Sequence, residues 1–146
     1  MRPTSVASKI SQVRLLLGAL AMIAITGAAV PRHVTGKTVI VNMLYTEKGM
    51  RFEPSKITVE RGDAVRFVNV SGGPHNVEFD RGTVPVEAIG PLSAAMANEL
   101  GNLSSGMVNE ADAAVTIIFD DVPSGTYRFF CTPHIGKGMT GAVTVR

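Results

Sequence analysis

Three residues near the C-terminus carry side chains that bind soft metal ions. The stretch CTPHIGKGM holds Cys131, the only cysteine of the 146-residue chain, together with His134 and Met139. A thiolate, an imidazole and a thioether belong to the ligand set of a type 1 copper site, which combines one Cys and two His with a weak axial Met. The loop therefore predicts a copper cofactor, and the site needs a second histidine.

Two further histidines could complete the ligand set. His33 follows the apolar N-terminal segment, whereas His75 stands in SGGPHNVEFD, directly before an expected strand. A ligand at the end of a strand is held by the rigid sheet, so His75 is the better candidate. A loop histidine bonded to backbone is the plainer interpretation of His75, and the surrounding residues GGPHN disfavour it.

Each residue of the C-terminal loop also has an interpretation without metal. Cys131 alone would be a buried structural thiol, and Met139 alone a core side chain. A cysteine hydrolase is another reading, because it needs a base near its thiol and His134 is close in sequence. No oxyanion-hole motif accompanies this pair, and three histidines in total are too few for a multicopper oxidase. We therefore predict a metal site and no enzyme.

Alternating apolar and polar residues predict an all-β domain from residue 37 onward. In TYRFFC, for example, Tyr127, Phe129 and Cys131 share one face and Arg128 and Phe130 the other. Many short runs of this kind, separated by turns rich in Gly, Pro, Asn and Asp, are typical of a β-sandwich or barrel. The expected strands lie in 37–44, 55–70 (two strands around a turn at 61–63), 75–80, 114–120, 126–131 and 141–146.

One stretch departs from the strand pattern. Residues 85–109 are rich in Ala, Met, Leu and Glu. Pro91 could begin a helix and Gly101 could end one. We predict a short helix over 92–100 that presents Leu92, Met96 and Leu100 on one face, with a loop as the alternative.

The first 29 residues have the pattern of an export signal. They contain three basic residues, no acidic one, and an apolar run, LLLGALAMIAITGAAV, that ends in small residues where a signal peptidase could cut. The run is short for a membrane span, which needs about 20 residues. We predict a cleaved signal peptide over 1–29, a single exported domain over 30–146, and a periplasmic or outer-face location. An uncleaved N-terminal anchor is the alternative.

The charge of the exported domain disfavours one class of partner. Three of the 14 basic residues lie in 1–29, which leaves 11 basic against 12 acidic residues, a net charge of −1. Nucleic-acid binding domains carry a basic excess, so we expect no nucleic-acid partner. A lone thiol outside the cytoplasm is prone to oxidation. We therefore expect Cys131 to be buried or bound to a partner such as a metal ion.

These stretches resemble a known family, the plastocyanins of the cupredoxin superfamily. CTPHIGKGM resembles the plastocyanin ligand loop Cys-x-x-His-x-x-x-x-Met, PHNVEFD the segment of the first histidine, and MRFEPSKITVERGDAVRFVN the early strands. The resemblance covers 39–145 and is poor between 81 and 109. It implies a cupredoxin-like Greek-key β-sandwich or barrel with one short helix.

The resemblance also implies the roles of particular residues. His75, Cys131, His134 and Met139 would be the ligands of one type 1 copper ion. Asn76 would tie the two ligand loops together and hydrogen-bond near the thiolate sulfur, a role typical of residues around a metal site.

A one-electron carrier cycling between Cu(I) and Cu(II) is the function that this site predicts. Electrons would pass through the edge of His134, where small and apolar residues let another protein approach. We expect a monomer that docks transiently with exported redox proteins such as cytochromes, a terminal oxidase or a copper reductase. Membrane contact would require that the N-terminal segment is retained. A copper carrier or storage protein without a redox circuit is the alternative, because it could use the same ligands.

Two departures from the family concern docking. Plant plastocyanins carry a tyrosine directly before the cysteine, beside an acidic patch. This chain has Phe130 at that position and no concentrated acidic cluster. The resemblance therefore supports copper chemistry and does not extend to a photosynthetic role.

Overall fold

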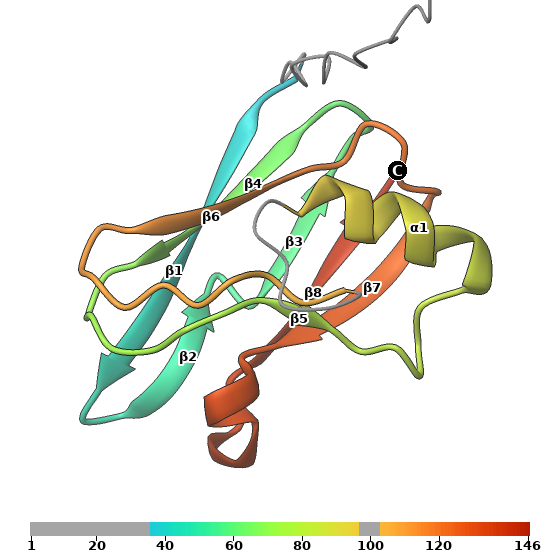
Figure 1. Ribbon diagram of the computed structural model, residues 1–146. Helices are drawn as coiled ribbons and strands as arrows, with labels where there is room; N and C mark the ends of the chain where they lie inside the picture. Colours follow the sequence, from blue (N-terminus) through green and yellow to red (C-terminus); the bar gives the residue numbers. More distant parts are fainter. Residues whose placement is uncertain (1–35, 97–102) are drawn as a thin grey trace, which may run out of the picture. The chain divides into compact units, whose positions relative to one another are not determined.

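The computed structural model describes residues 36–96 and 103–146, which build two four-stranded sheets (Figure 1). The first sheet has the order β2-β1-β4-β6 and the second the order β3-β8-β7-β5. The first contains β1 (Thr38–Thr46), β2 (Gly49–Glu53), β4 (Ala64–Asn69) and β6 (Ala114–Ile118). The second contains β3 (Lys56–Val59), β5 (Glu78–Phe79), β7 (Gly125–Phe130) and β8 (Thr140–Val145). The predicted all-β class is confirmed.

The turn between β3 and β4 carries the chain from one sheet to the other. Gly62 adopts a φ of 90°, which favours glycine, and Asp63 beside it is only 4% exposed. The Asp63 carboxylate accepts hydrogen bonds from the backbone N–H groups of Lys37 and Glu60, each at 2.9 Å. One buried carboxylate therefore satisfies a backbone donor within the turn and another directly before β1.

Aromatic rings join the two sheets in the core. Phe129 of β7 packs edge-on against Phe52 of β2, at a centroid distance of 4.9 Å, and against Phe67 of β4, at 5.2 Å. Edge-to-face contacts of this kind stabilise beyond the area that they bury. Gly141 lies opposite Phe129 in β8, where a Cβ would come within 2.7 Å of the Ser55 carbonyl oxygen. The same Cβ would lie 2.5 Å from Cζ of the Phe129 ring, so the packing of this ring requires a glycine in the neighbouring strand.

The one α-helix among the described residues differs from its prediction. We expected a helix over 92–100 that begins at Pro91, but α1 spans Val86–Ala95 and contains Pro91 in its interior. The helix begins directly after Pro85 and carries Glu87 in its first turn, where a negative charge is favourable. Proline inside a helix removes one backbone hydrogen bond but can be tolerated. Pro91 therefore does not mark the start of the helix, which lies five residues earlier at Val86.

Burial explains why α1 forms despite its proline. Ala88, Leu92 and Ala95 of the helix are buried in the core. Met96, which follows the helix, is also buried, whereas Leu100 and Gly101 of the prediction lie outside the described residues. Within 36–96 and 103–146, no helix is long and apolar enough to cross a membrane.

The loop between β7 and β8 forms the 3₁₀ helix η1 (Thr132–Lys137). Figure 1 shows η1 as the red turn at the lower end of the sheets, away from the C-terminus. Gly138 ends η1 in the left-handed conformation, with a φ of 78°, and so lets the chain turn back into β8.

The hydroxyl of Tyr127 provides a test of the packing between sheet and loop. This side chain is 1% exposed, and its hydroxyl donates a hydrogen bond of 2.7 Å to the Pro123 carbonyl oxygen. Tyr127→Phe should lower the free energy of unfolding by about 1–2 kcal/mol, because that carbonyl loses its partner. Denaturant unfolding followed by circular dichroism measures the change. Tyr45→Phe is the matched control, since Tyr45 is 61% exposed, and an equal loss in both variants would contradict the role of the bond.

Candidate metal centre

The structure brings His75, Cys131 and His134 together at one end of the sheets. The Cys131 Sγ lies 3.6 Å from His75 Nδ1 and 3.4 Å from His134 Nδ1. The ligand atoms of the three residues all lie within 4.8 Å of one another. Bonds of roughly 2.0–2.3 Å to a metal such as zinc place neighbouring ligand atoms about 3.5–4 Å apart. The three side chains therefore fit around one small cation with little movement.

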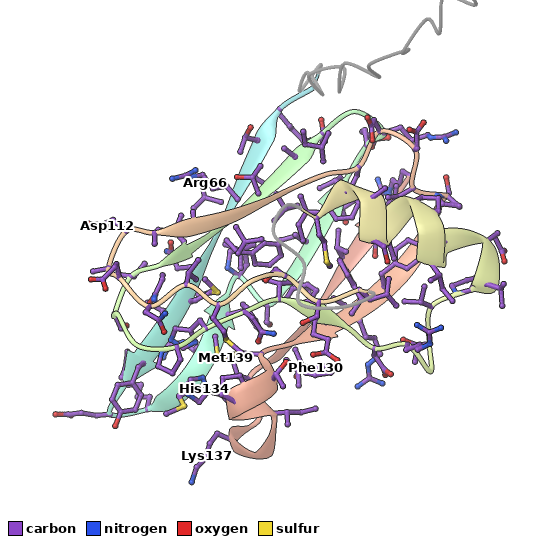
Figure 2. The ribbon with its side chains drawn as sticks, in the orientation of Figure 1. Arg66, Asp112, Phe130, His134, Lys137 and Met139 are labelled. Carbon is purple, nitrogen blue, oxygen red and sulfur yellow. The ribbon has the colours of Figure 1, made fainter. Side chains whose placement is uncertain are left out.

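Backbone hydrogen bonds fold the C-terminal loop so that Met139 returns to this end. The Cys131 N–H donates to the Met139 carbonyl oxygen at 3.1 Å, and the Met139 N–H donates to the His134 carbonyl oxygen at 3.3 Å. Figure 2 shows His134 and Met139 close together beside η1. Since the Met139 side chain is fully buried, its thioether belongs to the interior of this end rather than to its surface. The four predicted residues thus form a cupredoxin-like site.

His75 is held by the segment around Val108, for which the sequence analysis predicted no function. His75 pairs with Val108 through two backbone hydrogen bonds, of 3.0 Å and 2.8 Å. The buried Asn69 side chain, at the end of β4, donates from Nδ2 to the carbonyl oxygens of Gly73 and Val108. Part of the stretch between 85 and 109 therefore supports the metal centre directly.

Asn76 connects the two ligand segments, as the resemblance implied. Its Oδ1 accepts the backbone N–H of Thr132 at 2.8 Å, and its Nδ2 donates to the Thr132 hydroxyl at 2.8 Å. Asn76 follows His75 and Thr132 follows Cys131, so these bonds hold two ligands in register. Sequence reasoning missed Thr132, although its position directly after the cysteine and its hydroxyl were the available signals.

Burial sets the protonation of the metal-free site. It lowers the pKa of His75, with a smaller contribution from His134, and it lowers the pKa of His134. Burial also raises the pKa of the Cys131 thiol, and backbone hydrogen bonds from Asn76 and His134 partly oppose this effect. All three groups are therefore biased toward their neutral forms. A metal cation binds the thiolate, so its binding would release the Cys131 proton.

Exposure differs sharply among the four residues. His75 is 1% exposed, and the side chains of Cys131 and Met139 are fully buried. His134 is half-buried and lies in η1 beside the exposed Ile135. Of these four residues, His134 is the one that reaches the surface.

The donor set is suited to copper. Two imidazole nitrogens, one thiolate and one thioether combine soft sulfur with nitrogen, which selects copper over hard cations such as magnesium or calcium. Among the described residues, no Asp or Glu joins the cluster formed by His75, Cys131 and His134.

Comparisons with known proteins agree with this geometry. Residues 39–146 match the family described as copper binding proteins, plastocyanin/azurin family. Plastocyanin of Nostoc punctiforme is 36% identical over 104 residues, which cover 70% of each chain. Plastocyanin of Synechococcus sp. (strain JA-2-3B'a(2-13)) is 32% identical over 136 residues, which cover 93% of each chain.

Solved structures show the same relationship. Oxidised plastocyanin of Dryopteris crassirhizoma is 32% identical, with a TM-score of 0.59 over 74% of this chain and 100% of that one. Pseudoazurin of Methylobacterium extorquens AM1 is 28% identical, with a TM-score of 0.51 over 74% of both chains. The cupredoxin fold predicted from the sequence is confirmed. The chain belongs to the plastocyanin/azurin family of copper-binding proteins.

Proposed function

We propose that His75, Cys131, His134 and Met139 bind one type 1 copper ion, and that the protein carries single electrons between exported redox proteins. Membership of the plastocyanin/azurin family implies that the protein binds copper and transfers electrons. Bound copper supplies one-electron chemistry by alternating between Cu(I) and Cu(II). The observation that carries the proposal is the convergence of three ligand atoms within 4.8 Å, beside a fully buried methionine.

The chain supports electron transfer by holding its ligands still. His75 is fixed by backbone pairing with Val108, and Cys131 by its backbone bond to Met139. Hydrogen bonds between Asn76 and Thr132 join these two segments. Preorganised groups need little rearrangement when the charge of the site changes, and this favours rapid exchange of an electron. A ligand set so deeply buried is less suited to a carrier that must release its metal readily.

The edge of His134 is the proposed point of electron entry and exit. Ile135 beside it is 50% exposed, and Gly136 adds no side chain that would keep a partner away. Lys137 points away from the sheets in Figure 2. We infer a small, transient interface between a monomer and a cytochrome, a terminal oxidase or a copper reductase.

Export is proposed from the N-terminal sequence. Residues 1–29 have the basic, apolar and small-residue order of a signal peptide. Cleavage there would release the domain over 30–146 into the periplasm, and retention would leave it at the outer face of the membrane. In either case the partners are exported proteins.

The proposed function predicts that the protein binds copper through a thiolate. The protein with Cu(II) added should develop an intense blue absorption band and a small copper hyperfine splitting in its EPR spectrum, because a thiolate binds the metal. Visible absorption and EPR spectroscopy measure both. A pale protein with an ordinary tetragonal Cu(II) signal, or no binding, would contradict the proposal.

The thiolate is tested by Cys131→Ser. This variant should lose the blue band, because a serine hydroxyl does not replace the thiolate, whereas the fold should remain. Absorption and circular dichroism spectra recorded on the same samples separate the two effects. His33→Ala is the control and should stay blue, since His33 is not among the proposed ligands. Blue colour in the Cys131 variant would contradict the assignment.

The axial ligand is tested by Met139→Leu. The change conserves volume, so it should cost less than about 1.5 kcal/mol of stability. Copper should remain bound and the reduction potential should rise, because the axial ligand tunes the potential. Voltammetry measures the shift. Met96→Leu is the control, since Met96 is a buried methionine at the end of α1, and equal potentials in the two variants would exclude Met139 as a ligand.

A further inference from the structure

Glu78 is a carboxylate beside the metal centre that the ligand set does not use. It lies in β5 and is half-buried. Its Oε2 accepts a hydrogen bond of 2.6 Å from the Thr132 hydroxyl and one of 3.3 Å from the Ser104 hydroxyl. One carboxylate oxygen therefore connects β5 to the ligand loop and to the segment that holds His75.

The same two hydroxyls contact the Asn76 amide. Asn76 Nδ2 lies 2.8 Å from Thr132 Oγ1 and 3.2 Å from Ser104 Oγ. A hydroxyl has one hydrogen to donate, and an ionised carboxylate can only accept. Each hydroxyl therefore gives its hydrogen to Glu78 and keeps its oxygen as an acceptor. The two hydrogens of the Asn76 amide nitrogen satisfy these two oxygens.

This order of donors determines which way the Asn76 amide faces. With Nδ2 turned toward the hydroxyls, Oδ1 faces the Thr132 backbone N–H and accepts it at 2.8 Å. If the hydroxyls donated to Asn76 instead, its amide would turn over and Nδ2 would face the Thr132 N–H, donor against donor. The acceptor-only carboxylate of Glu78 excludes the reversed arrangement.

We propose that Glu78 is a positioning residue of the copper site, which sets the direction of the network that holds Asn76 and Thr132 in place. Those residues directly follow His75 and Cys131, so the network maintains the spacing of two ligands. The effect on copper rests on the proposed function, whereas the network exists without metal. The carboxylate also places a negative charge near a site that gains positive charge on oxidation, and so it lowers the reduction potential.

Hydrogen exchange of the metal-free protein tests the network. In Glu78→Gln the side chain can donate as well as accept, so the network loses its fixed direction. The Thr132 amide should exchange roughly ten- to a hundredfold faster by NMR, as expected for loss of a hydrogen bond to a charged group. The matched control is Glu47→Gln, which removes an equal charge from an exposed residue in the turn between β1 and β2. An unchanged Thr132 exchange rate in Glu78→Gln would overturn the proposal.

Substitutions at Thr132 give an independent test. Thr132→Val removes the hydroxyl and should speed the exchange of the same amide, whereas Thr132→Ser keeps the hydroxyl and should exchange at the wild-type rate. If both residues act through one network, Glu78→Gln should add little in the Thr132→Val background. Additive effects of the two substitutions would overturn the proposal.

The reduction potential separates positioning of the site from general stability. With copper bound, Glu78→Gln should stay blue and show a higher potential than the wild type, with a larger shift than Glu47→Gln. Equal shifts would overturn the claim that Glu78 acts on the site. Failure of the wild type to become blue would contradict the proposed function instead, and the exchange experiment would still decide the role of Glu78.

Discussion

The paired hydrogen bonds between Asn76 and Thr132 are the contact on which the metal centre depends. They join positions 56 residues apart, and each partner directly follows a predicted ligand. The Thr132 hydroxyl also donates to Glu78, and the Cys131 Sγ lies against His75 Nδ1, so the Asn76–Thr132 pair stands at the centre of the contacts between the two ligand segments. Because both the amide and the hydroxyl are used, the contact fixes orientation as well as distance. The pairing of β5 with β7, and the loop η1 that follows β7, bring these two residues together.

Burial gives the site its chemical character. Three of the four proposed ligands, His75, Cys131 and Met139, are buried, and His134 is half-buried. A buried charge is costly, and the pKa values of the thiol and the imidazoles all shift toward the neutral forms. A bound cation would reverse this preference for Cys131, because the thiolate and the metal compensate each other's charge. Burial thereby couples metal binding to release of a proton.

The region of poorest family resemblance contributes to the site in a way that its composition does not reveal. Val108 pairs with His75, and the Ser105 hydroxyl accepts the Val77 N–H at 3.0 Å. Ser104 joins the network of Glu78 and Asn76. The helix α1, earlier in the same region, buries one side against the core. Residues of this stretch thus pack against and hydrogen-bond to the segment that carries His75.

The sequence by itself determined what is local. Cys131, His134 and Met139 lie within nine residues, so their donor types and spacing identified the loop before any fold was known. In the segment HNVEFD, period-two alternation predicts that Asn76 and Glu78 share one face, which agrees with their shared contact to Thr132. Only the tertiary structure decided the contacts between distant segments: the approach of His75 to Cys131, the link through Ser104, and the crossing from β3 to β4. It also decided where α1 begins, since helix boundaries depend on burial as well as on proline. Such contacts arise from the packing of whole sheets, and no local pattern of residues records which strands will be neighbours.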